Sequence, residues 1–147
     1  MKGILSLKTI RLQGHAESKR DAIQQAGELL VQGGFVHPKY INGMLAREET
    51  MSTYVGNGVS IPHGEFNDLS LVYRTGISVL QLPTGVEWLP GDIAYLIVGI
   101  AATSDEHINI LANLAEVVEN PDTATMLAQT TDPKLILKYL NHSPKKR

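Results

Sequence analysis

The residue of this sequence best placed to do chemistry is His63, which stands between a proline and a glycine. It lies in the run Gly-Asn-Gly-Val-Ser-Ile-Pro-His-Gly-Glu over residues 56–65. Val59 and Ile61 alternate with a serine, as in a half-buried strand, and Pro62 lacks the amide hydrogen that would continue a sheet ladder. The glycine after the histidine lets the chain turn away and leaves room for a ligand. We therefore expect His63 at a strand end, held out of the core and presented to a partner.

His107 is the second candidate, because it lies in the first turn of a predicted helix over residues 105–119. Free backbone N–H groups and the helix dipole attract anions at such a place. In open α/β sheets, ligands bind where strand ends face helix N-termini. Two histidines at such a junction predict a phosphate site. On local grounds two plainer interpretations stay open: His63 only ends a strand, and His107 is an exposed residue of a helix start.

Other chemistries find little support in the sequence. A zinc site would need a third ligand, and neither an H-E-x-x-H pattern nor a closely spaced histidine pair occurs. The sequence has no cysteine, which excludes disulfides, thiolate metal sites and a cysteine nucleophile. It also has no G-x-S-x-G elbow, no Walker A loop and no G-x-G-x-x-G fingerprint. We therefore expect no metal and no nucleotide or other cofactor.

The composition predicts one globular domain over residues 1–147, with 43% hydrophobic and 19% charged residues. A formal net charge of −2 gives no overall attraction for nucleic acid or for an anionic membrane. The longest strongly apolar stretch, residues 93–102, is about half the length of a membrane-spanning helix. Because no signal peptide is apparent either, we expect a cytoplasmic protein.

Periodicity predicts the elements that must position these side chains. Strands are predicted over 4–12, 59–61, 76–82 and 93–102, and helices over 21–32, 38–49, 105–119, 122–129 and 133–141. The last strand is apolar on both faces, as expected of a central strand, and Pro83 closes the strand before it. Arg47 lies in the last turn of the second helix, where a cation is favoured. This order predicts an α/β domain in which a central mixed parallel/antiparallel β-sheet is flanked by helices on both faces.

Several segments together resemble one protein family. They are Arg47-Glu48 ahead of G-N-G-V-S-I-P-H-G, the strand G-I-S-V-L-Q-L-P-T-G-V-E-W, the core strand L-I-V-G-I-A-A and the helix start D-E-H-I. The sequence resembles the enzyme IIA domain of the bacterial sugar phosphotransferase system, mannitol/fructose class, with the mannitol branch most similar. The resemblance extends over residues 4–141.

The resemblance implies a phosphocarrier. His63 would accept a phosphoryl group from the phosphohistidine of the carrier protein HPr and pass it to a cysteine of enzyme IIB, which phosphorylates mannitol or a related sugar during uptake. Nε2 (the tele nitrogen) is the candidate for the phosphorylated atom, although the sequence leaves the choice of nitrogen open. His107 would stabilise the phosphate, and Arg47 would supply positive charge. The membrane would be reached only indirectly, through the IIB and IIC parts of the transporter.

Physical chemistry agrees with these implied roles. Phosphoryl transfer depends mainly on positioning and charge stabilisation. Imidazole is a nucleophile near neutral pH, and the arginine guanidinium offers a fixed fork for phosphate oxygens. Two alternatives stay open. One is a regulatory IIA-like protein of the nitrogen-related branch, which signals through its phosphorylation state. The other is a histidine-dependent hydrolase, for which the sequence contains no nucleophile motif.

Overall fold

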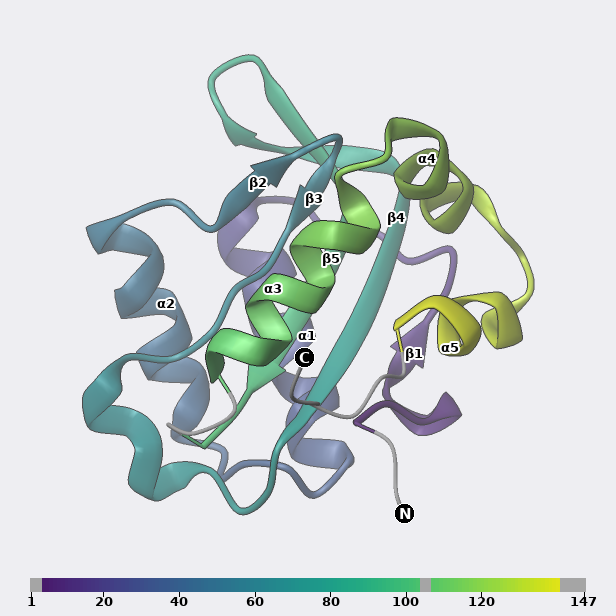
Figure 1. The fold of residues 1–147 in the computed structure, drawn as a ribbon. Coiled ribbons are helices and arrows are strands. Elements are labelled where there is room, and N and C mark those ends of the chain that lie inside the picture. Colours follow the sequence, from purple (N-terminus) through teal and green to yellow (C-terminus); the bar gives the residue numbers. More distant parts are fainter. Residues whose placement is uncertain (1–3, 104–106, 141–147) are drawn as a thin grey trace.

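The computed structural model describes residues 4–103 and 107–140, without the side chains of residues 66–67 and 107–108. The helices are α1 (Lys19–Gln32), α2 (Tyr40–Thr50), α3 (His107–Val118), α4 (Pro121–Gln129) and α5 (Pro133–Leu140); the strands are β1 (Ile10–Arg11), β2 (Tyr54–Gly56), β3 (Val59–Ser60), β4 (Gly76–Leu89) and β5 (Asp92–Ala101) (Figure 1). Two short 3-10 segments, η1 (Leu7–Thr9) and η2 (Phe66–Leu71), complete the order. No helix within the described ranges is long and apolar enough to cross a membrane.

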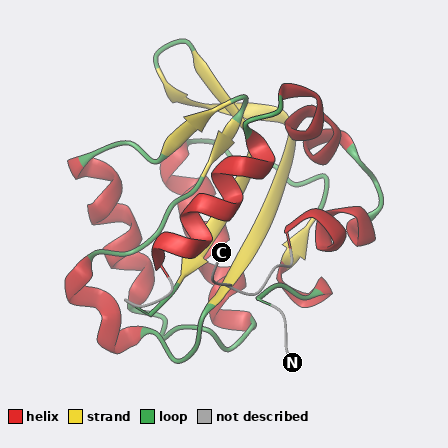
Figure 2. Cartoon of the chain, in the orientation of Figure 1, coloured by secondary structure: helices red, strands yellow, loops and turns green. Residues whose placement is uncertain are grey.

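The strands, yellow in Figure 2, form one mixed sheet. Their order in the sheet is β1-β4-β5-β3-β2. β5 lies in the middle, antiparallel to β4 and parallel to β3, while β1 runs parallel to β4. The predicted central strand is therefore confirmed. Its apolar character on both faces follows from its position, because helices cover each side of it.

Two apolar cores hold the helices on opposite faces of the sheet. On one face α1 and α2 pack through Leu30 and Met44 against sheet residues such as Ile97. On the other face α3, α4 and α5 pack against residues such as Val98. The predicted α/β class, with a mixed sheet between helical layers in a single domain, is confirmed.

Two strand predictions are wrong in extent. Residues 4–12 were expected to be one strand, but η1 interrupts that segment at Leu7–Thr9 and β1 has only two residues. Pro83 was expected to close a strand, yet β4 continues to Leu89. The pairing of β4 with β5 shifts register between Gln81 and Val86, and such an irregularity accommodates a proline that cannot donate to the ladder.

The helix predictions hold more closely. Ser18 caps α1 by accepting a hydrogen bond from the Asp21 amide, 3.0 Å away. In α3, helical spacing predicts that Leu114, Ala115 and Val118 are buried. Leu114 and Val118 are buried, but Ala115 is exposed and Ile110 is buried instead. Ser104, which the sequence favours as the cap of this helix because its hydroxyl can accept from a first-turn amide, lies outside the described residues.

Candidate functional site

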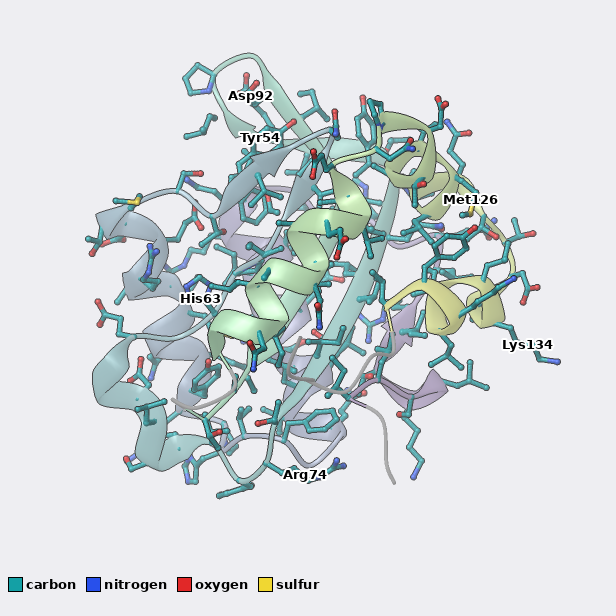
Figure 3. All side chains as sticks on the ribbon, viewed as in Figure 1. Tyr54, His63, Arg74, Asp92, Met126 and Lys134 are labelled. Atoms are coloured by element: carbon teal, nitrogen blue, oxygen red, sulfur yellow. The ribbon has the colours of Figure 1, made fainter. Side chains whose placement is uncertain are left out.

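His63 follows β3 at the edge of the regular sheet. The β3–β5 ladder stops at Ser60, as expected ahead of Pro62, and one further parallel bridge then joins His63 to Ile100 of β5. The residue is only 7% exposed, so it is less accessible than expected, although it belongs to neither apolar core. Because the bridge continues the sheet by one residue, it draws His63 inward between the two helical layers, where Figure 3 shows it between α2 and α3.

A backbone carbonyl orients the imidazole of His63. Its Nδ1 lies 2.8 Å from the carbonyl oxygen of Ile61. A carbonyl can only accept a hydrogen bond, so Nδ1 carries the proton and Nε2 has the lone pair. The two residues are adjacent on one face of an extended segment, which explains why so short a tether is possible. The arrangement makes Nε2 the nucleophilic nitrogen of the neutral ring.

The glycine after the histidine has a different role from the one expected. Gly64 was predicted to leave room for a ligand, but a Cβ there would lie 2.5 Å from the ring of Tyr40. The ring therefore occupies the space that the missing side chain leaves. The Gly64 amide donates to the Tyr40 hydroxyl over 2.8 Å, and that hydroxyl donates to the Ile100 carbonyl over 2.9 Å.

Arg47 lies in the last turn of α2, as predicted, and its side chain is half-buried. Its Nη1 donates to the Met51 carbonyl over 2.7 Å, which caps the helix end with a cation. Arg47 forms no ion pair with a carboxylate of the described residues. The carboxylate of its neighbour Glu48 pairs instead with Lys19. Since a guanidinium has five N–H donors in a fixed fork, Arg47 keeps donors for an anion.

A buried carboxylate connects the Arg47 turn to the His63 segment. Glu48, 5% exposed, accepts hydrogen bonds from the Thr53 amide and hydroxyl and from the Trp88 indole N–H. The Thr53 carbonyl in turn accepts from the amide of Ile61, at 3.0 Å. Ile61, whose carbonyl orients His63, is therefore linked by hydrogen bonds through Thr53 to Glu48, which directly follows Arg47.

His107 is the first residue of α3, which agrees with its predicted position in a first helical turn. Its side chain lies outside the described part of the chain, so a contact with His63 stays a prediction. The backbone brings the two segments into one region, because His63 is bridged to Ile100 and β5 ends one residue later, ahead of α3. The site therefore lies at the carboxyl ends of the parallel strands β3 and β5, where open α/β sheets place ligands.

Sequence reasoning missed Tyr40 and the role of Glu48. Nothing in a helix sequence distinguishes a tyrosine or glutamate that bonds a distant strand from one that faces solvent. A weak signal existed in Gly64, since a glycine beside a functional residue often marks close packing. The described residues contain no group of three histidine, cysteine or acidic side chains that could hold a metal ion.

Comparison with known proteins identifies the family. A family model described as "Phosphoenolpyruvate-dependent sugar phosphotransferase system, EIIA 2" matches residues 3–143. The chain belongs to this family. The resemblance recognised in the sequence motifs is confirmed, and residues 3–143 are an EIIA-2 domain of this family.

Solved structures place the fold close to mannitol enzyme IIA. Enzyme IIA mannitol from Escherichia coli is 38% identical, with a TM-score of 0.86, and the match covers 92% of the EIIA-2 domain and 98% of that chain. A complex from the same organism, of mannitol enzyme IIA with phosphorylated mannitol enzyme IIB, contains a chain with a TM-score of 0.87 and 37% identity, and this match covers 92% and 96% of the two chains. The resemblance to the mannitol branch thus extends from sequence to structure.

Curated relatives are much longer proteins. A multiphosphoryl transfer protein of Haemophilus influenzae is 48% identical over 128 residues, which cover 87% of the EIIA-2 domain and 26% of that relative. A mannitol-specific EIICBA component of Vibrio cholerae is 38% identical, and 21% of its length is covered. The EIIA-2 domain therefore spans about a quarter of the first relative and about a fifth of the second.

Proposed function

We propose that residues 1–147 form a single phosphocarrier domain in which His63 is the phosphorylated residue. It receives the phosphoryl group from the phosphohistidine of HPr and passes it to a cysteine of enzyme IIB, for phosphorylation-coupled uptake of mannitol or a related sugar. The observation that carries this proposal is the 2.8 Å contact between Nδ1 of His63 and the Ile61 carbonyl. That contact leaves the lone pair on Nε2 and so prepares the ring for one reaction at one atom.

The chemistry at Nε2 needs no external base. The lone pair attacks the phosphorus atom, and the bond to the HPr nitrogen breaks with its electron pair remaining on HPr. The phosphorylated ring still carries its proton on Nδ1 and gains positive charge, which the Ile61 carbonyl dipole stabilises. In the second transfer a thiolate of enzyme IIB attacks phosphorus, Nε2 leaves with its electron pair, and the neutral ring is restored.

Arg47 and His107 act on the phosphate rather than on the ring. The guanidinium of Arg47 spreads its donors over phosphate oxygens in the loose transition state. His107 stabilises the phosphorylated state from the start of α3, where backbone N–H groups favour an anion. No metal or nucleotide takes part. The location of the protein in the cytoplasm stays a prediction.

The relatives support transfer between proteins. One of them is found as a complex of mannitol enzyme IIA with phosphorylated enzyme IIB, and others are named multiphosphoryl transfer proteins. The alternative is a regulatory role, as in the nitrogen regulatory IIA protein of Neisseria meningitidis, which has a TM-score of 0.80 but only 25% identity. The higher identity to mannitol enzyme IIA favours the transport role.

Phosphorylation with a labelled donor tests the proposal. The EIIA-2 domain is incubated with labelled phosphoenolpyruvate, enzyme I and HPr, and the acid-labile phosphate is counted. We expect His63→Ala to abolish the label and His15→Ala, a change at an exposed histidine, to leave it unchanged. Label retained by His63→Ala would refute the site. We expect His107→Ala to accept phosphate and to transfer it poorly.

A second assay separates transport from regulation. Labelled EIIA-2 domain is mixed with purified mannitol- or fructose-class enzyme IIB. The transport role predicts that the label moves to the IIB cysteine. A protein that is labelled at His63 but passes nothing to any IIB of these classes would instead fit the regulatory alternative.

A further inference from the structure

Beside His63, a tyrosine hydroxyl lies within the pairing between the chain and β5. The Ile100 amide donates to the Pro62 carbonyl over 2.9 Å, which is the first bond of the parallel bridge at His63. In a regular parallel ladder the second bond would run from the Gly64 amide to the Ile100 carbonyl. The Tyr40 hydroxyl lies between these two groups, accepting from one at 2.8 Å and donating to the other at 2.9 Å.

The opposite end of β3 has the same construction. The Gly58 amide donates to the Tyr54 hydroxyl over 3.1 Å, and that hydroxyl donates to the Ile93 carbonyl over 3.4 Å. Figure 3 shows Tyr54 and His63 far apart along the molecule, with β3 between them. Among the described residues, two tyrosine hydroxyls thus link the chain on either side of β3 to β5, and we call each such link a tyrosine clamp. Only the Tyr40 clamp borders His63.

The tyrosine beside His63 is the more buried of the two. Tyr40 is 4% exposed, and its ring fills the space next to Gly64. Burial raises the pKa of Tyr40 to about 12, against an opposing effect of the Gly64 amide hydrogen bond and with a smaller contribution from Asp68. The hydroxyl consequently stays protonated at physiological pH and keeps its bond to Ile100.

We propose that Tyr40 is a positioning residue for phosphoryl transfer, which sets where His63 stands by spacing the Gly64 amide from the Ile100 carbonyl. This inference rests on His63 being the phosphorylated residue. Without the hydroxyl, the Gly64 amide either closes directly onto the Ile100 carbonyl or loses its partner. Each outcome moves the peptide that carries the imidazole, and displacements on this scale slow reactions that depend on alignment.

Paired tyrosine variants test the proposal. Tyr40→Phe and Tyr54→Phe each remove one hydroxyl from the same kind of clamp, so Tyr54→Phe is the matched control. We expect Tyr40→Phe to lower the maximal rate of His63 phosphorylation by phospho-HPr about tenfold or more. The half-saturating phospho-HPr concentration should change less than twofold, because Tyr40 is buried. Tyr54→Phe should leave both quantities within twofold of the parent protein.

A spectroscopic readout accompanies the rates. Nitrogen-15 NMR of the His63 ring should shift in Tyr40→Phe and stay unchanged in Tyr54→Phe, at comparable losses of thermal stability. Gly64→Ala, whose methyl group would press on the Tyr40 ring, should slow transfer as well and serves if Tyr40→Phe does not fold. Unchanged rates in the folded Tyr40→Phe variant, or equal losses in both phenylalanine variants, would overturn the proposal.

The design keeps this proposal separate from the proposed function. If phospho-HPr fails to label His63 in the parent protein, the phosphocarrier function is wrong. The effect of Tyr40 on the ring is then measured with phosphoramidate, a small donor that needs no docking. A tenfold slower reaction of His63 with phosphoramidate in Tyr40→Phe would still support the positioning role, and an unchanged rate would refute it.

Discussion

A tyrosine clamp lies on either side of strand β3, but the surroundings of the two clamps differ. At one end His63 is buried beside Arg47's helix and ahead of α3. At the other end Asn57 and Gly58 form a turn beside an open cavity of about 630 Å³. The residues lining that cavity include Tyr95 and Gln129 and, in the described part of the chain, no charged side chain.

The difference shows that a clamp alone does not make a site. Both ends hold the chain on β5 with a hydroxyl, yet only one lies at the carboxyl ends of the parallel strands. There a helix N-terminus follows β5, and that geometry favours an anion. The cavity beside Asn57 is lined by no charged side chain among the described residues. We therefore expect changes near His63 to alter phosphoryl transfer and changes near Asn57 to alter stability alone.

The largest change in the rate of phosphoryl transfer among these variants is expected for Arg47, at the end of β3 where His63 lies. Arg47→Ala should lower the maximal rate of phosphoryl transfer about 100-fold, the usual loss when one donor to a developing charge is removed. Arg47→Lys should lose less, because it keeps the charge but not the fork. Arg20→Ala, at an exposed position in α1, is the control. Stopped-flow or quench kinetics with phospho-HPr measure the rates, and a wild-type rate in Arg47→Ala would remove Arg47 from the site.

Glu48, the buried residue that follows Arg47, should matter for the stability of the fold. Glu48→Ala leaves the Thr53 amide, the Thr53 hydroxyl and the Trp88 indole N–H without their acceptor. We expect the free energy of unfolding to fall by about 3 kcal/mol. Glu49→Ala, at the exposed neighbour, should change it by less than about 0.5 kcal/mol. Urea denaturation measures both, and equal losses would show that the Glu48 network contributes nothing.

The smallest effect is expected at the turn end. Asn57 has a positive φ of 53°, and its side-chain amide donates to the carbonyls of Val118 and Glu119. Asn57→Gly tolerates the backbone angle but loses those bonds, and should cost about 1 kcal/mol of unfolding free energy. Transfer rates should stay within twofold. A larger loss of rate than of stability would contradict the division between the two ends.

The sequence predicted the layered fold because its helices and central strand carry clear periodicity. Helical spacing predicts that Ile23 and Leu30 of α1 are buried, and both are, whereas the burial of Gly27 was not expected. The extents of β1 and β4 were not, since a register shift around Pro83 depends on the partner strand. Strand ends are set by pairing, which a single sequence does not record.

The candidate site could be predicted from the sequence only where a residue is marked by its neighbours along the chain. His63 is marked by its proline and glycine, and Arg47 by its place in a helix end. Tyr40 bonds residues 24 and 60 positions away, and the Trp88 indole reaches Glu48 across 40 positions. Such long-range partners leave no spacing in the sequence, so only the folded chain reveals them.

The central claim is that Nε2 of His63 carries the phosphate while Nδ1 keeps its proton on the Ile61 carbonyl. Phosphorylating the nitrogen-15-labelled EIIA-2 domain with phospho-HPr and recording two-dimensional NMR spectra of the histidine rings tests it directly. The prediction is one phosphorylated ring, that of His63, with phosphorus coupled to Nε2 and a proton retained on Nδ1. Phosphate on Nδ1, or on any other residue, would contradict it.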